Sequence, residues 1–277
     1  MKFGIATFPT DYSIPPAELA IALEERGFES MWVAEHSHIP ADRTSPWPGG
    51  DELPKMYYDV MDPFVVLSAA AAVTTTLRIG TGICLVVQRD PLQTAKAVAS
   101  LDQISGGRFL FGIGAGWNAE EMANHGTVFE TRLRLMRERV EAMKQVWTEP
   151  KAEYHGELVD FAPVMAWPKP VQKPHPPIHV GGAFPGAVRR AIRYGNGWMP
   201  IHGRGGATRE QMASLREMAE AAGRDPAEIE VSVYGCPPRA EEVEAYRDAG
   251  VARVVFGLPP EVRAETLTHL DGMTKLF

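Results

Sequence analysis

Residues 77–117 read LRIGTGICLVVQRDPLQTAKAVASLDQISGGRFLFGIGAGW. Two runs of strand-forming residues, Leu77–Ile83 and Arg108–Ile113, bracket one helix's length of apolar-periodic sequence, and glycines crowd the end of each run. In parallel β/α proteins the functional site lies where strands end and loops begin. Glycine has no Cβ, so a ligand can approach the backbone closely there. The stretch therefore predicts a β/α/β unit and the rim of a site.

Strand-like and helix-like runs alternate along nearly the whole chain, and the helices start with their usual signals, such as Asp62–Pro63 and Asp90–Pro91. Eight strands that alternate with helices predict a (β/α)8 TIM barrel rather than an open doubly wound sheet. The 277 residues fit a single barrel domain over 1–277. The strand-like runs are Phe3–Thr7, Met31–Ala34, Leu77–Ile83, Arg108–Ile113, Ile178–Val180, Trp198–Ile201, Glu230–Tyr234 and Arg253–Phe256.

Two irregular stretches interrupt this alternation, one after the second strand and one after the fourth. Residues 37–61 contain several prolines with interleaved aromatics such as Trp47 and Tyr57, which favours a packed active-site loop over a disordered linker. Residues 149–177 combine a hairpin-like YHGELVDF with the proline-rich WPKPVQKPHPP. Proline lacks the N–H that a ladder needs, so we expect a hairpin followed by an extended connector. Both stretches are expected as barrel insertions.

The composition indicates a cytoplasmic globular protein. The chain is 45% hydrophobic and 23% charged, and its net charge of −7 argues against nucleic acid or an anionic membrane as the main partner. Two cysteines, Cys84 and Cys236, are too few for a disulfide framework or a cysteine metal site. The start MKFGIATF has no signal-peptide pattern, and no apolar run approaches the roughly 20 residues that cross a bilayer.

His36 ends the second strand, in WVAEHSHIP. Neighbouring strand residues point to opposite faces, so Glu35 and His36 cannot both point into a barrel unless the strand has already ended. An imidazole at this rim can donate a hydrogen bond, exchange a proton or bind a metal near neutral pH. It can equally do no more than bond to the loop, and its position leaves both interpretations open.

His36 and His38 form a His-x-His pair, which raises the alternative of a metal-dependent barrel hydrolase. His179 and His202 fall near the strands that supply further ligands in such enzymes. Against this alternative, the pair follows the second strand instead of the first. The last strand, RVVFGLPP, also offers no aspartate. We therefore expect no metal.

Gly181 and Gly182 follow the strand IHV and precede a helix. Free N–H groups and the dipole at a helix start can bind an anion, although a plain turn has the same sequence. Arginines on that helix would add positive charge: Arg189, Arg190 and Arg193.

The segment GIGAGW at 112–117 matches only part of the dinucleotide fingerprint. It lacks the third glycine, and no acidic residue closes a second strand about 20 residues later. A nicotinamide Rossmann site is therefore not expected. Cys84 is expected as a small packed residue instead of a nucleophile, because no base can be assigned to it.

Taken together, the chain resembles the bacterial luciferase-like monooxygenase superfamily, and within it the oxidoreductases that use the deazaflavin coenzyme F-420. The matching pieces cover nearly the whole chain in the same order. They are WVAEH, RIGTGI, RDP, LDQISGGRFLFGIGAGW, YHGELVDF, PKPVQKPHPPIHVGG and GNGW.

The resemblance implies a TIM barrel with an isoalloxazine or deazaisoalloxazine ring across its C-terminal mouth. It implies a non-prolyl cis peptide behind the ring at Gly82–Ile83, and it matches His36 to a histidine on the substrate side. Gly181–Ala183 match the segment that takes the coenzyme phosphate. The coenzyme contacts expected from the resemblance are Thr81, Gly82, Ile83, Cys84, Gly114, Ala115, Gly116, Gly181, Gly182 and Ala183.

The chain departs from the family at Trp117, where the sugar-phosphate dehydrogenases carry a glutamate. This departure puts their acid role and their substrate in doubt. Glu120 and Glu121 are nearby, but we expect them on a helix.

We expect an oxidoreductase that moves a hydride between C5 of coenzyme F-420 and a small organic substrate, with His36 holding or protonating a substrate heteroatom. Residues 37–61 would cover the site, and the enzyme is expected as a homodimer. The coenzyme's oligoanionic tail needs a basic groove that this acidic composition does not predict. One alternative is an FMN-dependent monooxygenase that uses O2 and a partner reductase, and another is a barrel that binds flavin without turnover.

Overall fold

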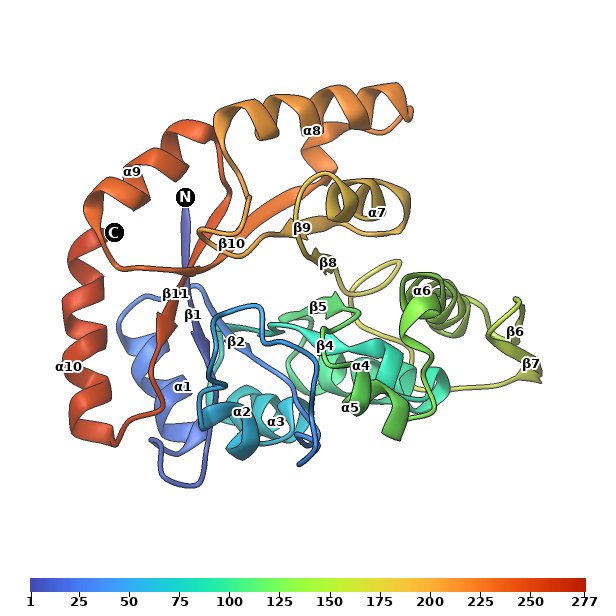
Figure 1. The fold of residues 1–277 in the computed structure, drawn as a ribbon, viewed down its shortest axis with the longest axis horizontal. Coiled ribbons are helices and arrows are strands. Elements are labelled where there is room, and N and C mark those ends of the chain that lie inside the picture. The colour runs from blue at the N-terminus through green and yellow to red at the C-terminus, as the bar shows by residue number, and fades with distance from the viewer.

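The computed structural model describes residues 1–277, and its centre is a closed parallel barrel surrounded by helices (Figure 1). β1 pairs with β2 on one side and with β11 on the other, and β3 pairs with β5, so the sheet closes on itself. This confirms the predicted TIM barrel. The barrel strands are β1 (Lys2–Thr7), β2 (Ser30–Val33), β3 (Arg78–Thr81), β4 (Cys84–Leu85), β5 (Phe109–Gly114), β8 (Ile178–Gly181), β9 (Gly197–Met199), β10 (Glu230–Cys236) and β11 (Arg253–Leu258).

β3 and β4 share one position in the barrel, and a bulge at residues 82–83 separates them. β3 meets the start of β5 through the pair Ile79–Phe109, and β4 meets its end through Cys84–Ile113. The Gly82–Ile83 peptide bond in this bulge is cis. The strand predicted over 77–83 therefore ends early, because the chain leaves the sheet at Gly82.

The helices lie outside the barrel and begin at the predicted caps. Asp62 accepts hydrogen bonds from the N–H groups of Phe64 and Val65, and Asp90 accepts one from Gln93. Proline at the first helical position follows each cap, where its missing N–H costs no hydrogen bond. The helices are α1 (Pro16–Glu25), α2 (Met56–Asp59), α3 (Pro63–Val73), α4 (Pro91–Ile104), α5 (Ala119–Asn124), α6 (Arg132–Thr148), α7 (Gly186–Tyr194), α8 (Arg209–Ala221), α9 (Ala240–Ala249) and α10 (Arg263–Met273).

The two insertions leave the barrel at different places. The stretch 37–61, which we call the lid loop, contains only the short helix α2. The second insertion holds an antiparallel hairpin of β6 (Ala152–His155) and β7 (Asp160–Val164), which projects at the far edge beyond α6 (Figure 1). No helix in the chain combines the length and the apolar character that a membrane span needs.

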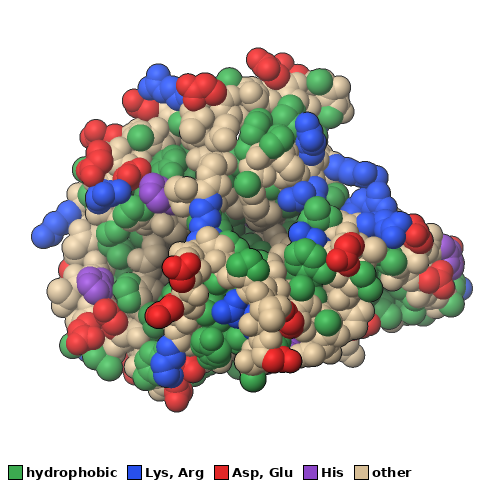
Figure 2. Space-filling model, in the orientation of Figure 1, with side chains coloured by type: hydrophobic (Ala, Val, Ile, Leu, Met, Phe, Trp, Pro, Cys, Tyr) green, Lys and Arg blue, Asp and Glu red, His purple; other side chains and the backbone are tan.

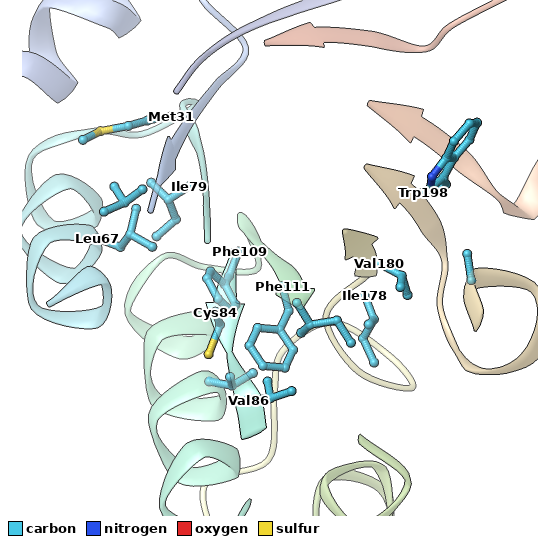
Figure 3. Packing of buried hydrophobic residues seen from close by; sticks show 14 of the residues in the cluster. Met31, Leu67, Ile79, Cys84, Val86, Phe109, Phe111, Ile178, Val180 and Trp198 are labelled. Carbon is cyan, nitrogen blue, oxygen red and sulfur yellow. The ribbon is translucent and has the colours of Figure 1, made fainter. Parts of the chain in front are cut away.

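Apolar side chains fill the layer between strands and helices. Figure 3 shows part of this layer, in which Leu67 of α3 lies beside Ile79 and Phe109 lies beside Phe111. Each such fully buried side chain contributes roughly 1.5–3 kcal/mol to folding. At the amino-terminal end of the strands, the buried Arg253 pairs with Glu29 at 2.7 Å. The site therefore has to lie at the opposite, carboxyl-terminal end of the barrel, which we call the mouth.

Candidate active site

β2 ends at Val33, and the side chains of Glu35 and His36, which follow it, bind different partners. Glu35 is buried, accepts a hydrogen bond from the backbone N–H of Leu85 at 2.5 Å, and pairs with Arg89. Arg89 in turn pairs with Asp62 at 2.6 Å. Glu35 thus fastens β4 to the end of β2, and His36 is left to face the mouth.

His36 is held by a carboxylate that the sequence did not assign to the site. Its Nδ1 lies 2.9 Å from Oε2 of Glu121, and the backbone N–H of Ser37 donates to Oε1 of the same carboxylate at 3.2 Å. Glu121 has an exposed fraction of 0%. The other ring nitrogen of His36, Nε2, has no hydrogen-bond partner and is not among the buried unpaired atoms. The His36 side chain is 6% exposed, and Nε2 is its ring nitrogen that stays free of protein hydrogen bonds.

Aromatic side chains surround His36. The ring of Tyr57, from the lid loop, lies 5.3 Å from the imidazole, and the ring of Trp117 lies 5.8 Å from it. Trp47 packs against Tyr57 at 5.5 Å, and Phe8 packs against it at 4.8 Å. The packed-loop interpretation of residues 37–61 is therefore correct for this part of the loop, which forms an apolar wall over the histidine.

Glu120 on α5 holds the lid loop in place. Its Oε1 accepts hydrogen bonds from the N–H groups of Thr44 at 2.9 Å and Ser45 at 3.1 Å. The hydroxyl of Ser45 accepts a hydrogen bond from Ala119 N–H at 3.1 Å. Hydrogen bonds from Ser45 and Thr44 lower the pKa of Glu120 to about 2, so this contact stays ionised near neutral pH.

The Gly82–Ile83 bulge fits into a cradle made by glycines. A Cβ on Gly114 would collide with the Ile83 side chain, and a Cβ on Gly181 would lie 3.2 Å from it. A Cβ on Gly82 would lie 2.5 Å from Cε2 of Tyr234, whose hydroxyl is buried without a partner. Burial raises the pKa of Tyr234. Only residues without a side chain allow this close approach of three strand ends around the bulge.

Three of the predicted coenzyme contacts present no side chain to the mouth. Thr81 is buried and donates its hydroxyl proton to the carbonyl of Gly112 at 2.6 Å. Cys84 lies with Phe111 inside the apolar cluster (Figure 3), and burial raises the pKa of its thiol well above the usual value. Ala115 is buried in the same cluster. These residues pack the barrel because strand alternation turns them away from the mouth, and the packed interpretation of Cys84 is confirmed.

The start of α7 combines glycine backbone with Arg190, for whose guanidinium no hydrogen bond or salt bridge is found. The guanidinium Nη2 of Arg190 lies 3.4 Å from the position of a Cβ on Gly182, and its Nη1 lies 3.4 Å from that of a Cβ on Gly186. Nε of Arg190 and Nε of Arg132 are both buried without a hydrogen-bond partner. Burial lowers the pKa of Arg190, Tyr194 partly offsets this effect, and the charge of Arg132 lowers the pKa further. Figure 2 shows Lys and Arg side chains beside the central hollow on the side of α6 and α7. Ala183 is exposed in the same segment.

Gly116 was predicted as a coenzyme contact, whereas Arg132 was not predicted for the site. Gly116 has φ of 72° and turns the chain from β5 into α5, next to Leu85 and Met122. Arg132 starts α6, where its Nη1 donates to the carbonyl of Phe129 at 2.7 Å. No pattern in the sequence indicated that Arg132 and Arg190 would meet, because they lie on separate helices.

The histidines considered for a metal site do not converge. His38 bonds to Ser37 and Asn124 at the rim. His179 is buried beside Trp32, and burial together with Arg253 lowers its pKa to about 3. His202 bonds to the hydroxyl of Tyr246 at 2.8 Å. No group of three or more side chains that could hold a metal ion occurs in the chain. The histidines whose spacing in the sequence suggested a metal site therefore do not form one in the structure.

Fold and site together define an α/β barrel whose mouth combines a rim histidine, a glycine cradle and an arginine pair. The family model for luciferase-like monooxygenases matches residues 11–272, and the chain belongs to this family. An uncharacterised protein of Mycobacterium tuberculosis is 38% identical over 99% of this chain and 97% of its own length. An F-420-dependent glucose-6-phosphate dehydrogenase of Kineococcus radiotolerans is 30% identical over 78% of this chain and 61% of that protein.

Solved structures with the same fold include an F-420-dependent enzyme and an FMN-bound one. The monooxygenase RslO1 from Streptomyces bottropensis superposes with a TM-score of 0.78 at 24% identity, covering 100% of this chain and 98% of that one. An F-420-dependent secondary alcohol dehydrogenase has a TM-score of 0.77 at 19% identity, with coverages of 100% and 98%. The FMN-bound oxygenating component of 3,6-diketocamphane monooxygenase from Pseudomonas putida has a TM-score of 0.65 at 21% identity, with coverages of 87% and 69%.

Proposed function

We propose that this protein is an oxidoreductase that transfers a hydride between coenzyme F-420 and a small organic substrate. The observation that carries the proposal is the unpaired Nε2 of His36 after β2, the strand that pairs with the one ending in the Gly82–Ile83 bulge. Val33 of β2 is in register with Thr81 of β3, and the Val33 carbonyl accepts a hydrogen bond from Gly82 N–H at 2.7 Å. His36 follows three residues after Val33, so the histidine and the bulge come from adjoining strand ends. A proton-handling group thus lies at the strand end next to the one that carries the glycine-supported bulge.

The residues at the mouth fit a flat ring that carries a phosphorylated side chain. Gly82, Gly114 and Gly181 let the bulge, the Ile83 side chain and Tyr234 pack closely together, and a flat ring would lie against the bulge that they support. The guanidinium of Arg190 lies with Nη2 near Gly182 and Nη1 near Gly186, and a phosphate would supply acceptors for these donors. We assign the ring to the bulge and the phosphate to Arg132, Arg190 and Gly181–Ala183.

In the proposed mechanism, the bound coenzyme supplies the carbon that accepts or donates the hydride. His36 holds the substrate heteroatom through Nε2 and exchanges a proton with it. Tyr57 and Trp117 confine the substrate beside the imidazole, and the lid loop excludes water. The arginine pair holds the far end of the coenzyme and so orients the ring in the mouth.

The alternative is an FMN-dependent monooxygenase that takes electrons from a partner reductase and reacts with O2. It is favoured by the FMN-bound structural neighbour, since FMN also presents a ring and a phosphate. The 30% identity with an F-420-dependent dehydrogenase favours the deazaflavin. A barrel that binds either coenzyme without turnover is the third possibility, and a cytoplasmic location remains a prediction of the sequence.

Titration with each coenzyme decides between these proposals. We expect saturable quenching of tryptophan fluorescence by F-420 with a dissociation constant at least about tenfold lower than for FMN, a difference of about 1.4 kcal/mol. Tighter binding of FMN would replace our proposal by the monooxygenase. Binding of F-420 without hydride transfer to any alcohol or aldehyde tested, in either direction, would support the barrel without turnover.

We also propose a homodimer that buries the outer face of α3. This helix has no charged residue, and Val65 is 70% exposed on it. Ala69, Ala72 and Val73 follow at helical spacing and are exposed too. A contiguous apolar helix face of this kind is typical of protein interfaces.

Light scattering tests the dimer. We expect twice the mass of the 30.4 kDa chain for the wild type and the monomer mass for Val65→Lys. Val128→Lys is the matched control, because Val128 is also exposed (59%) but lies outside α3. A monomeric wild type would contradict the assignment.

A further inference from the structure

We propose that Glu121 is a positioning residue that decides which ring nitrogen of His36 carries the proton. This inference rests on the proposed function only in its last step, where Nε2 meets the substrate. A carboxylate has only acceptors to offer, and its two oxygens are each used here. Oε1 accepts from the N–H of Ser37 at 3.2 Å, and Oε2 lies 2.9 Å from Nδ1 of His36.

The proton therefore belongs on Nδ1. With Oε2 as an acceptor, Nδ1 has to be the donor, and neutral His36 then presents the lone pair of Nε2 to the mouth. When His36 is protonated, Nε2–H becomes a donor to the same place. In neither state does Nδ1 face the ligand, so one nitrogen alone meets the substrate.

The contact between the Glu121 carboxylate and His36 is rigid because both residues are held in place and water is excluded. The exposed fraction of Glu121 is 0%, so no solvent competes for its oxygens. Its own backbone N–H donates to the side chain of Asn118 at 3.1 Å, which caps α5. This cap sets the first turn of α5 so that Glu121 points back to the end of β2.

This arrangement bears on Trp117, where the sequence showed the absence of a glutamate. Position 117 is a tryptophan and offers no carboxylate, and the chain places one four residues later, at Glu121. It reaches the Nδ1 side of the histidine, away from the substrate. Its role is to orient the imidazole, as carboxylates behind metal-bound or catalytic histidines do.

Glu120 provides the matched control within the same helix turn. It carries the same side chain one residue earlier, and its carboxylate binds Thr44 and Ser45 of the lid loop instead of the histidine. Glu120→Gln therefore removes a neighbouring charge from α5 and leaves the contact to His36 in place.

The tautomer of His36 can be read by 15N NMR on protein labelled at its eight histidines, with His36→Gln identifying the signals. We expect a protonated Nδ1 in the wild type and in Glu120→Gln. In Glu121→Gln, the amide oxygen has to stay with Ser37 N–H, so the amide NH2 faces Nδ1. Nδ1 then becomes the acceptor, and the proton moves to Nε2.

Kinetics provide the second measurement. Glu121→Gln should lower kcat about 100-fold, the scale of general acid–base effects, and leave the KM for the coenzyme within about twofold. A protonated Nε2 in the wild type, an unchanged tautomer in Glu121→Gln, or a reversed tautomer with normal kcat would each overturn the proposal. The coenzyme titration can fail independently of the tautomer measurement, so the two proposals fail in different ways.

Discussion

Replacing His36 with alanine should lower kcat by about 10²–10⁴-fold, the range that a positioned acid or base contributes. Coenzyme affinity should change by less than about threefold, because the ring and phosphate contacts proposed above come from other strand ends. The reason is the geometry after β2, where Nε2 of His36 has no hydrogen-bond partner in the protein. Steady-state turnover and fluorescence titration measure the two quantities separately.

A second substitution separates holding the substrate from transferring a proton. Glutamine at position 36 can donate and accept hydrogen bonds but cannot exchange a proton near neutral pH. If proton transfer is the role, His36→Gln should be as slow as His36→Ala. If holding the heteroatom is enough, glutamine should recover most of the loss.

His38→Ala is the control for His36→Ala. His38 lies two residues on, and its ring bonds to Ser37 and Asn124 at the rim. We expect its turnover to stay within about threefold of the wild type, since the residue offers no nitrogen to the mouth. Normal activity of His36→Ala would remove His36 from the catalytic role.

The sequence was sufficient for the architecture because barrel strands and helices have local periodicities. The eight strand runs fall on the eight barrel positions, and the caps at Asp62 and Asp90 start their helices as expected. It was insufficient at residues 82–85, where β-forming residues continue the pattern through the bulge. The bulge at Gly82 depends on neighbours from other strands, such as Tyr234, and only the family resemblance pointed to it.

The position of His36 after the second strand could be predicted from the sequence, whereas its distant contacts could not. His36 could be placed on the rim because it follows the strand-like run Met31–Ala34. Its partner Glu121 lies 85 residues away in the sequence. A glutamate in the first turn of a helix is common as a capping residue, so its type and place did not distinguish it. The local sequence around Glu121 does not show that α5 packs against the end of β2.

Removing the charge of Arg190 should weaken coenzyme binding without destabilising the fold. A hydrogen bond to a charged group contributes about 1.5–3 kcal/mol, which corresponds to roughly a tenfold to hundredfold higher dissociation constant. Arg190→Met keeps the apolar stem of the side chain and removes the guanidinium. The guanidinium has no carboxylate partner, so we expect Tm to stay the same or to rise.

Two further arginines on α7 serve as controls. Arg189 and Arg193 lie on the same helix and are exposed, while Arg190 is half-buried. Arg189→Met and Arg193→Met remove the same charge from the same element, so an effect of net charge alone would appear in all three variants. We expect a large loss of affinity only in Arg190→Met and in Arg132→Met, whose Nε is also buried and unpaired.

A coenzyme analogue identifies which part of the coenzyme Arg190 holds. A deazaflavin that lacks the phosphate-bearing side chain should bind wild type and Arg190→Met equally, because the lost contact is absent in both complexes. The difference between the two ligands then measures the coupling of Arg190 to the phosphate, free of effects on folding or on the ring. Equal losses for both ligands would place Arg190 against the ring instead. The affinity difference for the full coenzyme should also shrink as salt is added, because screening weakens a contact between charges at a partly open site.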